Sequence, residues 1–301
     1  MNSLLLHLSD IHFRAQANPI LQKLAAIVAA TRTHGAGINA CIIAASGDIA
    51  FSGKQEEYKE AEIFFASLRT SLQEVLPNIP IHWAFIPGNP DCDHNKATSM
   101  RRMILKSTPA VLDEIGKGDT SIVDTATEVQ REFFQFFNKL EPGAGPSSGD
   151  RRLKYTAKSQ INGESVSLEC YNTAWLSQLE EKQGKLFFPE NLLRDEKSDS
   201  CLAISMFHHP YNWLNPDNAR RFRKHVETTA DVILTGHEHV PDVYEKTRVL
   251  GQVTHYVEGA VLQDSDENMS GFNVLLIDSD ESKWKCSNIF GNLASGYIRR
   301  F

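Results

Sequence analysis

The chain has 301 residues, of which 41% are hydrophobic and 23% are charged, and its formal net charge is −7. This length and composition are typical of a globular protein with a large core. The negative charge excludes indiscriminate nucleic-acid binding through a global positive field, although a local basic groove stays compatible with it. Five cysteines without paired spacing fit reduced thiols. No stretch resembles a membrane span or a signal peptide, so we expect a cytoplasmic protein with no membrane partner.

The first half of the chain alternates strand-like and helix-like runs. Apolar runs at 4–8, 42–46 and 81–86 predict buried parallel strands. The segments from Pro19 to Gly35 and from Gln55 to Leu76 place apolar residues at helical spacing. This alternation predicts a right-handed βαβ unit at the start of an α/β domain.

Residues 94–150 have a different character, with short helical patterns and no strand-like run. We interpret them as a helical insert that caps the site within a single domain of residues 1–301. The last pattern is rich in phenylalanine (Phe133–Phe137), and its helical spacing predicts the core of this insert. A Gly-rich connection at 143–149 then predicts a flexible link back to the sheet.

The second half of the chain is mainly β. Alternating runs at 154–161 and 165–171 flank Asn162-Gly163 and predict a β-hairpin. Further strand-like runs lie at 202–207, 232–234, 253–257, 272–277 and 283–289, and a polar helix lies at 216–228. Together the two halves predict two sheets packed face to face with helices outside.

Residues that can bind metal stand at the ends of five strand-like runs. They are Asp10, His12, Asp48, Asn89, His208, His237 and His239. In open α/β sheets the carboxyl ends of the strands are the edge where ligands bind. Carboxylate, amide and imidazole donors without a thiolate fit Mn, Fe, Zn or Ni and argue against a structural zinc knot. The sequence therefore predicts a metal centre at this edge.

The order Asp-x-His, Gly-Asp, Gly-Asn, His and Gly-His-x-His resembles the calcineurin-like metallophosphoesterase superfamily. The resemblance implies a four-layer α/β/β/α sandwich and two divalent metal ions, manganese being the preferred identity. It assigns Asp10, His12 and His239 to one metal, Asn89, His208 and His237 to the other, and Asp48 to both. The family pattern favours His208 over His209 as the ligand, because His208 stands two positions before Pro210.

The resemblance implies hydrolysis of a phosphoester by a metal-activated hydroxide. Among substrates we expect phosphodiesters, either nucleic acid or a cyclic nucleotide. The segment 47–53, with Glu57, Tyr58 and Ala61 behind it, is similar to bacterial phosphoesterase domains. Some of those are fused to larger NTPase or signalling regions, which implies a possible partner of this kind.

One block departs from the family pattern. The family has His after Gly-Asn, paired with the acidic residue that follows, whereas this chain has Pro90 followed by Asp91. Pro90 cannot donate a proton, and loss of a general acid typically costs about 10²–10⁴ in rate. Three interpretations stay open: an impaired enzyme that keeps its metals, an active enzyme with a substitute acid, or a binding module without catalysis. The candidate substitute acids are Asp93, His94 and His209.

Three residues are candidates for contacting substrate: Arg14, His94 and Asn172. A solvated loop arginine and a plain turn are the alternative interpretations of Arg14 and Asn172. Paired arginines at 101–102, 151–152 and 220–221 are expected on hydrated surface. If they line one groove, they favour a polynucleotide substrate.

Overall fold

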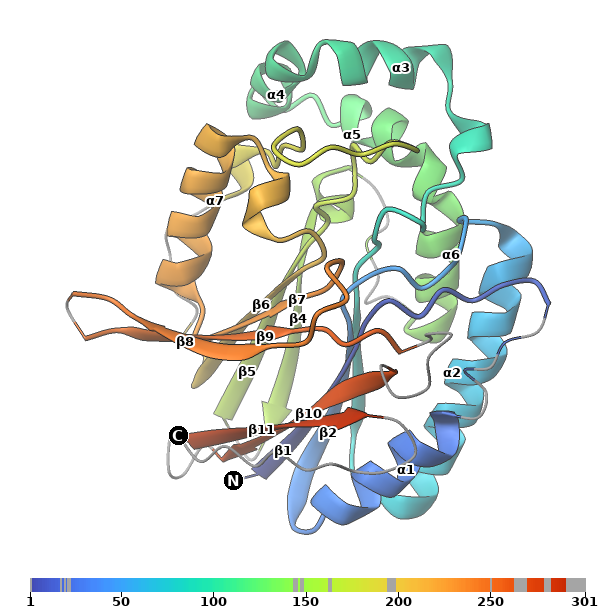
Figure 1. Ribbon diagram of the computed structural model, residues 1–301, viewed down its shortest axis with the longest axis vertical. Coiled ribbons are helices and arrows are strands. Elements are labelled where there is room, and N and C mark those ends of the chain that lie inside the picture. Colours follow the sequence, from blue (N-terminus) through green and yellow to red (C-terminus); the bar gives the residue numbers. More distant parts are fainter. Residues whose placement is uncertain are drawn as a thin grey trace.

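The computed structural model describes residues 2–16, 18, 20, 23–142, 146, 149–161, 164–193, 199–249, 251–262, 270–278 and 283–290. Two β-sheets pack against each other and helices cover their outer sides, as Figure 1 shows. The predicted α/β/β/α sandwich is therefore confirmed. The helix start predicted at Pro19, most of the link at 143–149 and the turn at Asn162-Gly163 lie outside the described residues.

The first sheet has the strand order β11-β10-β1-β2-β3. Its strands are β1 (Asn2–Leu8), β2 (Ile38–Ala45), β3 (Ile81–Phe85), β10 (Gly271–Asp278) and β11 (Lys283–Phe290). Strands β1, β2 and β3 are parallel to one another, and β10 pairs antiparallel with β1. Helices α1 (Lys23–His34) and α2 (Gln55–Val75) pack beside each other over this sheet (Figure 1). The continuous apolar sequence of β2 follows from its position, because β2 is almost completely buried.

The second sheet has the strand order β4-β5-β6-β7-β9-β8. Its strands are β4 (Lys154–Ile161), β5 (Glu164–Tyr171), β6 (Leu202–Phe207), β7 (Val232–Thr235), β8 (Val243–Thr247) and β9 (Val253–Glu258). Helix α7 (Pro216–Thr229) packs on its outer face, and the side chain of Asn215 caps the helix by accepting a hydrogen bond from Asp217 N. Strand β8 was not predicted from the sequence, because this edge strand is mostly exposed and carries little apolar alternation.

Helices fill the chain between β3 and β4. They are α3 (Ser99–Lys106), α4 (Thr108–Gly116), α5 (Ser121–Ala126) and α6 (Arg131–Leu140), with short 3₁₀ helices η2 (His94–Lys96), η3 (Thr127–Gln130) and η4 (Gly149–Arg152). Helices α3 to α5 pack on one another and share a hydrophobic cluster with α7 and residues of the second sheet, whereas α6 packs against α2. The prediction that Phe133–Phe137 form the core of an insert is wrong, because these rings pack into the main core with Phe65 and Phe85.

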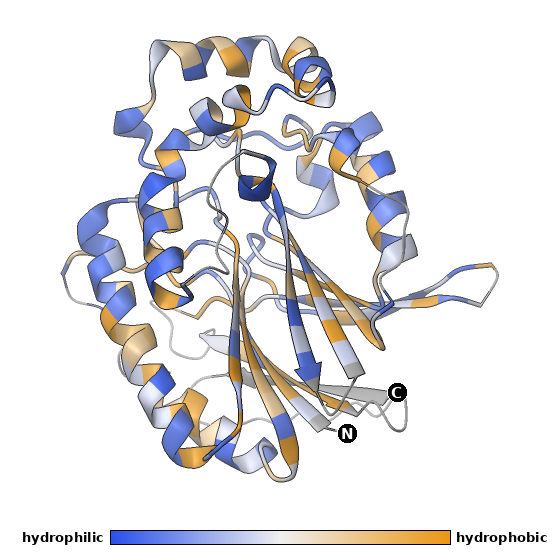
Figure 2. Cartoon of the chain, turned by 180° about the vertical axis from the view of Figure 1, so that it is seen from behind, coloured by the Kyte–Doolittle hydropathy of each residue, from blue (hydrophilic) through white to orange (hydrophobic). Residues whose placement is uncertain are grey.

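The larger hydrophobic core lies between the sheets and under α1, α2 and α6. Figure 2 shows apolar residues concentrated on the strands and mixed faces on the outer helices. The expectation of surface exposure fails for Arg101, which is 2% exposed and donates hydrogen bonds to the carbonyls of Ala126 and Ser177. Within the part of the chain that is described, no helix is long and apolar enough to cross a membrane.

Candidate metal centre

The loops at the carboxyl ends of β1, β2 and β7 bend sharply at the residues predicted to bind metal. Five of these residues have φ between 52° and 76°: Asp10, His12, Asp48, His237 and His239. Non-glycine residues seldom adopt this left-handed conformation, and strain of this kind concentrates at functional sites. Backbone hydrogen bonds hold two of the bends together, since the amides of Ile11 and His12 both donate to Asp48 O at 2.8 Å.

Four predicted ligands form a first cluster: Asp10, His12, Asp48 and His239. One ligand atom of each lies within 4.8 Å of the others. His239 Nε2 lies 3.2 Å from Asp10 Oδ1, and His12 Nε2 lies 3.8 Å from Asp48 Oδ2. The two carboxylates are buried, whereas the side chain of His239 is 49% exposed. The cluster therefore opens to solvent on the side of His239.

The remaining predicted ligands meet on the other side of Asp48. His208 Nε2 lies 3.0 Å from Asp48 Oδ1 and 3.2 Å from Asn89 Oδ1. His237 Nδ1 lies 3.1 Å from the same Asn89 oxygen. The Nδ1–H of His208 donates to Ser46 O at 2.8 Å, which aims Nε2 at Asn89 and Asp48. The two carboxylate oxygens of Asp48 thus face different clusters.

The chemistry of these donors fits a pair of divalent cations. Asp10 Oδ1, Asp48 Oδ1 and His12 Nδ1 are buried atoms with no hydrogen-bond partner among the described residues. Burial raises the pKa of Asp48 despite the neighbouring His208, which opposes this shift, so the buried charge of this carboxylate is only partly compensated. Burial and then the neighbouring His208 lower the pKa of His237 to about 2, which leaves this imidazole neutral. A neutral imidazole and buried carboxylate oxygens of this kind are donors that divalent metal ions bind.

Asp91 stabilises the loops that follow β2 and β3 by hydrogen bonding. This buried carboxylate accepts hydrogen bonds from the backbone amides of Ile49, Ala50 and Gly88 and from the hydroxyl of Tyr58, at 2.7 to 3.1 Å. Burial raises the pKa of Asp91 to about 6. Because it joins the loop after β2 to the loop after β3, Asp91 fixes the relative position of the ligands on those loops.

A second buried network supports Asp10. Asn273 Nδ2 donates to His7 Nδ1 at 3.2 Å, so His7 Nε2 carries the proton and donates to Ser46 Oγ at 2.8 Å. Ser46 Oγ donates to Ser9 Oγ at 2.9 Å, and Ser9 Oγ donates to Asp10 Oδ2 at 2.5 Å. Burial lowers the pKa of His7 to about 4, which keeps it neutral. This series of hydrogen bonds orients Asp10, and no motif in the sequence indicated it.

His209 lies beside the ligands, and one of its ring nitrogens is within 4.8 Å of a ring nitrogen of His208 and of His237. Its Nε2 lies 3.0 Å from Glu181 Oε2, and its Nδ1 lies 3.1 Å from Thr173 Oγ1. Both ring nitrogens therefore have partners, although the ring centroid is 4.6 Å from that of His237. Trp213 packs edge-on against His237 at 4.2 Å between centroids. Sequence reasoning missed Glu181, which stands in a loop without a recognisable motif.

The predicted substrate residues have different surroundings. Arg14 is exposed and lies 4.2 Å above the ring of Phe51, itself 49% exposed and 6.4 Å from the ring of His12. His94 is half-buried at the start of η2. Asn172 is buried, and its amide donates to Gln130 Oε1 and to a backbone carbonyl. Arg14 and Phe51 thus form a rim beside the first cluster, while Asn172 holds a turn.

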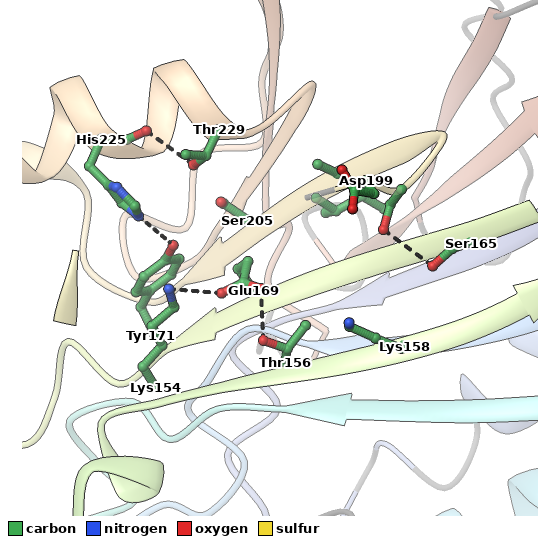
Figure 3. A pocket seen from close by; sticks show the side chains of 13 residues that line it. Lys154, Thr156, Lys158, Ser165, Glu169, Tyr171, Asp199, Ser205, His225 and Thr229 are labelled. Atoms are coloured by element: carbon green, nitrogen blue, oxygen red, sulfur yellow. Dashed lines mark hydrogen bonds and ion pairs between the residues drawn. The ribbon is translucent and has the colours of Figure 1, made fainter. Parts of the chain in front are cut away.

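A cavity of about 420 Å³ lies elsewhere, on the strands β4 to β6 beside α7 (Figure 3). None of the predicted site residues lines it. Its polar groups are largely paired with one another: Glu169 binds Lys154 and Thr156, and the hydroxyl of Tyr171 lies 3.0 Å from His225 Nε2. The cavity is therefore separate from the metal-ligand set.

Solved structures with similar folds share 10% sequence identity with this chain. A dimetal phosphatase from Danio rerio has a TM-score of 0.47, and the match covers 96% of this chain and 96% of that chain. Vps29 from Cryptosporidium parvum has a TM-score of 0.41, with 99% of this chain and 95% of that chain covered. The sulfate thiohydrolase SoxB from Thermus thermophilus has a TM-score of 0.51, with 99% of this chain and 58% of that chain covered. Comparison with curated proteins gives no match. A family model described as calcineurin-like phosphoesterase matches residues 4–241, which include all seven predicted ligands. The chain therefore belongs to the calcineurin-like phosphoesterase family.

Proposed function

We propose that the chain is a phosphodiesterase that uses two divalent metal ions, manganese being the preferred identity. The proposed ligands are Asp10, His12 and His239 for one metal, Asn89, His208 and His237 for the other, and Asp48 for both. The main observation that supports this proposal is the position of Asp48 between the two groups of ligands. One of its oxygens lies 3.0 Å from His208 Nε2 and the other 3.8 Å from His12 Nε2, as expected for a carboxylate shared by two cations.

When bound, two such metals supply Lewis acidity and a hydroxide nucleophile at neutral pH. The chain's own residues hold and shape the site around them. Asp91 and the hydrogen bonds behind Asp10 keep the donors in place, as outer partners of metal ligands do. The guanidinium of Arg14 stands at the rim, where it can pair with a phosphate oxygen. Phe51, which is 49% exposed beneath Arg14, adds an aromatic ring to this rim that a nucleoside base can contact, and this supports a nucleotide substrate.

The missing histidine at Pro90 limits the chemistry. Asp91, which would pair with that histidine, is held by four hydrogen bonds and acts by positioning rather than by proton transfer. Of the candidate substitute acids, His209 lies beside His237. Asp93 caps η2 and lies 3.8 Å from Lys96 Nζ. We therefore expect diesters with good leaving groups to be the best substrates, because they need a proton least.

A second candidate function is binding without turnover, and Pro90 is the observation that favours it. In this case the metals recognise a nucleotide or phosphate, and the domain acts through a partner. A cytoplasmic location and association with a larger NTPase or signalling region stay predictions.

Hydrolysis of bis-p-nitrophenyl phosphate with added Mn²⁺ tests the proposed function. We expect measurable turnover by the wild type, with a lower rate on the monoester p-nitrophenyl phosphate. Pro90→His restores the family's acid, so it should raise the turnover number by about 10²-fold at unchanged metal content. Metal-loaded wild type without turnover, together with an active Pro90→His variant, would favour the binding function. Inactivity of both proteins despite two bound metals would contradict the proposed catalytic site.

A further inference from the structure

A basic groove lies on the outer side of α7, where the helix meets β8. The groove has a volume of about 650 Å³. Five cationic side chains and one carboxylate line it: Arg220, Arg223, Lys224, Lys246, Arg248 and Glu227. Leu214, Ala219 and Tyr211 also line it and add apolar surface. This concentration of positive charge contrasts with the net charge of −7 of the whole chain.

Glu227 neutralises only part of the positive charge. It is 3% exposed and accepts hydrogen bonds from Arg223 Nε and Lys246 Nζ, both at 2.7 Å, and from the hydroxyl of Tyr256. The side chains of Arg220 and Lys224 have no partner among the described residues. Both are exposed and stand four positions apart on one face of α7. Like charges at this spacing destabilise a helix slightly, and a bound polyanion would relieve that repulsion.

The groove adjoins the metal centre through the short helix η6 (Tyr211–Trp213). Tyr211 and Asn212 line the groove, and the chain leading to them follows directly from His208 and His209. On the other side of η6, Trp213 Nε1 donates to Glu238 Oε1 at 2.7 Å, and its ring packs on His237. Only one short helix therefore separates the groove from the residues predicted to bind metal.

We propose that this groove binds the phosphate backbone of a single-stranded nucleic acid whose scissile linkage lies at the metal centre. The inference rests on the proposed phosphodiesterase function and names its substrate class. Cations together with apolar and aromatic lining suit phosphates and a sugar or base together. A cavity of about 650 Å³ matches the size of ordinary ligand sites, so it accommodates a short stretch of one strand rather than a duplex.

The test compares two double variants of equal charge change. Arg220→Glu with Lys224→Glu alters the groove. Arg32→Glu with Lys59→Glu is the control, because these exposed residues lie on α1 and α2, away from α7 (Figure 1). Binding of a labelled phosphorothioate oligothymidylate, which resists hydrolysis, is measured by fluorescence anisotropy with the metal-loaded full chain. The same preparations are assayed on bis-p-nitrophenyl phosphate, a small diester that reports on the metal centre.

We expect the groove variant to bind the oligonucleotide about tenfold or more weakly and the control variant to bind like the wild type. The plot of log affinity against log salt concentration has a negative slope, and the magnitude of this slope should decrease by about 1.4 in the groove variant. Each phosphate contact of a single strand contributes about 0.7, and the variant loses two such contacts. Hydrolysis of the small diester should stay unchanged. Equal weakening in both variants, or no oligonucleotide binding by the wild type, would overturn the proposal. Binding of phosphatidylserine vesicles in place of the oligonucleotide would also overturn it.

A separate outcome concerns the proposed function alone. If no preparation hydrolyses the small diester while the oligonucleotide binds in the groove, the catalytic proposal fails and the groove remains a nucleic-acid site. If the small diester is hydrolysed and the oligonucleotide does not bind, the groove proposal fails and the proposed phosphodiesterase function stands. The two readouts therefore distinguish failure of the groove from failure of the metal centre.

Discussion

Gly88→Ala should disrupt the metal centre directly. A Cβ atom added at Gly88 would lie 1.9 Å from Asp48 Oδ1 and 2.8 Å from His208 Nε2. Neither group has room to retreat, since Asp48 and His208 are buried and the His208 ring is held by Ser46 O. Overpacking of this kind typically costs about 1–3 kcal/mol of stability. We expect metal affinity to fall by about 10–100-fold, the loss typical when a ligand's support is disturbed.

Gly116→Ala is the matched control for this prediction. An added Cβ at Gly116 meets nothing within 4 Å, and the residue ends helix α4. Metal affinity is measured by isothermal titration with Mn²⁺, and stability by urea unfolding of the same samples. Gly116→Ala should leave affinity unchanged and keep or slightly raise stability. If Gly88→Ala bound Mn²⁺ as tightly as the wild type, the close approach of the loop after β3 to these two donors would not matter for the site.

Three further predictions concern the supporting contacts. Tyr58→Phe removes a hydrogen bond from the buried carboxylate of Asp91 and should lower the free energy of unfolding by about 1–3 kcal/mol; a loss below about 0.5 would contradict this role. Ser9→Ala removes the shorter of the two hydrogen bonds to Asp10 Oδ2 and should weaken Mn²⁺ binding about tenfold in the same titration, whereas an unchanged affinity would show that the contact is dispensable. Burial raises the pKa of Glu227, but hydrogen bonding outweighs burial and lowers this pKa from 4.5 to about 2. The ionised Glu227 therefore stabilises the folded protein above pH 4.5, and this stabilisation is lost as pH falls toward 2. Between about pH 5 and pH 3 the wild type should therefore lose about 2 kcal/mol more than Glu227→Gln in urea unfolding, and equal losses would refute the shift.

The sequence indicated most of the sandwich because its central strands are continuous apolar runs that end in polar residues. The run before Asp48 and the run before His208 both form buried strands, β2 and β6; β6 has its predicted bounds, whereas β2 begins four residues earlier than predicted. Parallel strands bring their carboxyl ends to one edge, so polar residues far apart in the chain are expected to lie together there. The structure places the other six predicted ligands around Asp48.

Features without a periodic or motif signal were not predictable in this way. Strand β8 is an exposed edge, so its side chains do not alternate between core and solvent. The spacing of Phe133–Phe137 indicated a buried helix face but not the partner of that face, which is the main core. His7 and Glu181 act through contacts with residues distant in sequence, and such contacts leave no local pattern. The basic groove likewise joins α7 to β8, and only Arg220 belonged to a noted basic pair.

The most direct test of the central claim is the electron paramagnetic resonance spectrum of the protein titrated with Mn²⁺. We expect about two ions per chain and a spin-coupled spectrum, because Asp48 lies between both clusters and would connect the two ions. Asp48→Ala should abolish the coupling. Fewer than about one ion per chain, or two ions that give independent uncoupled signals in the wild type, would contradict the shared metal centre.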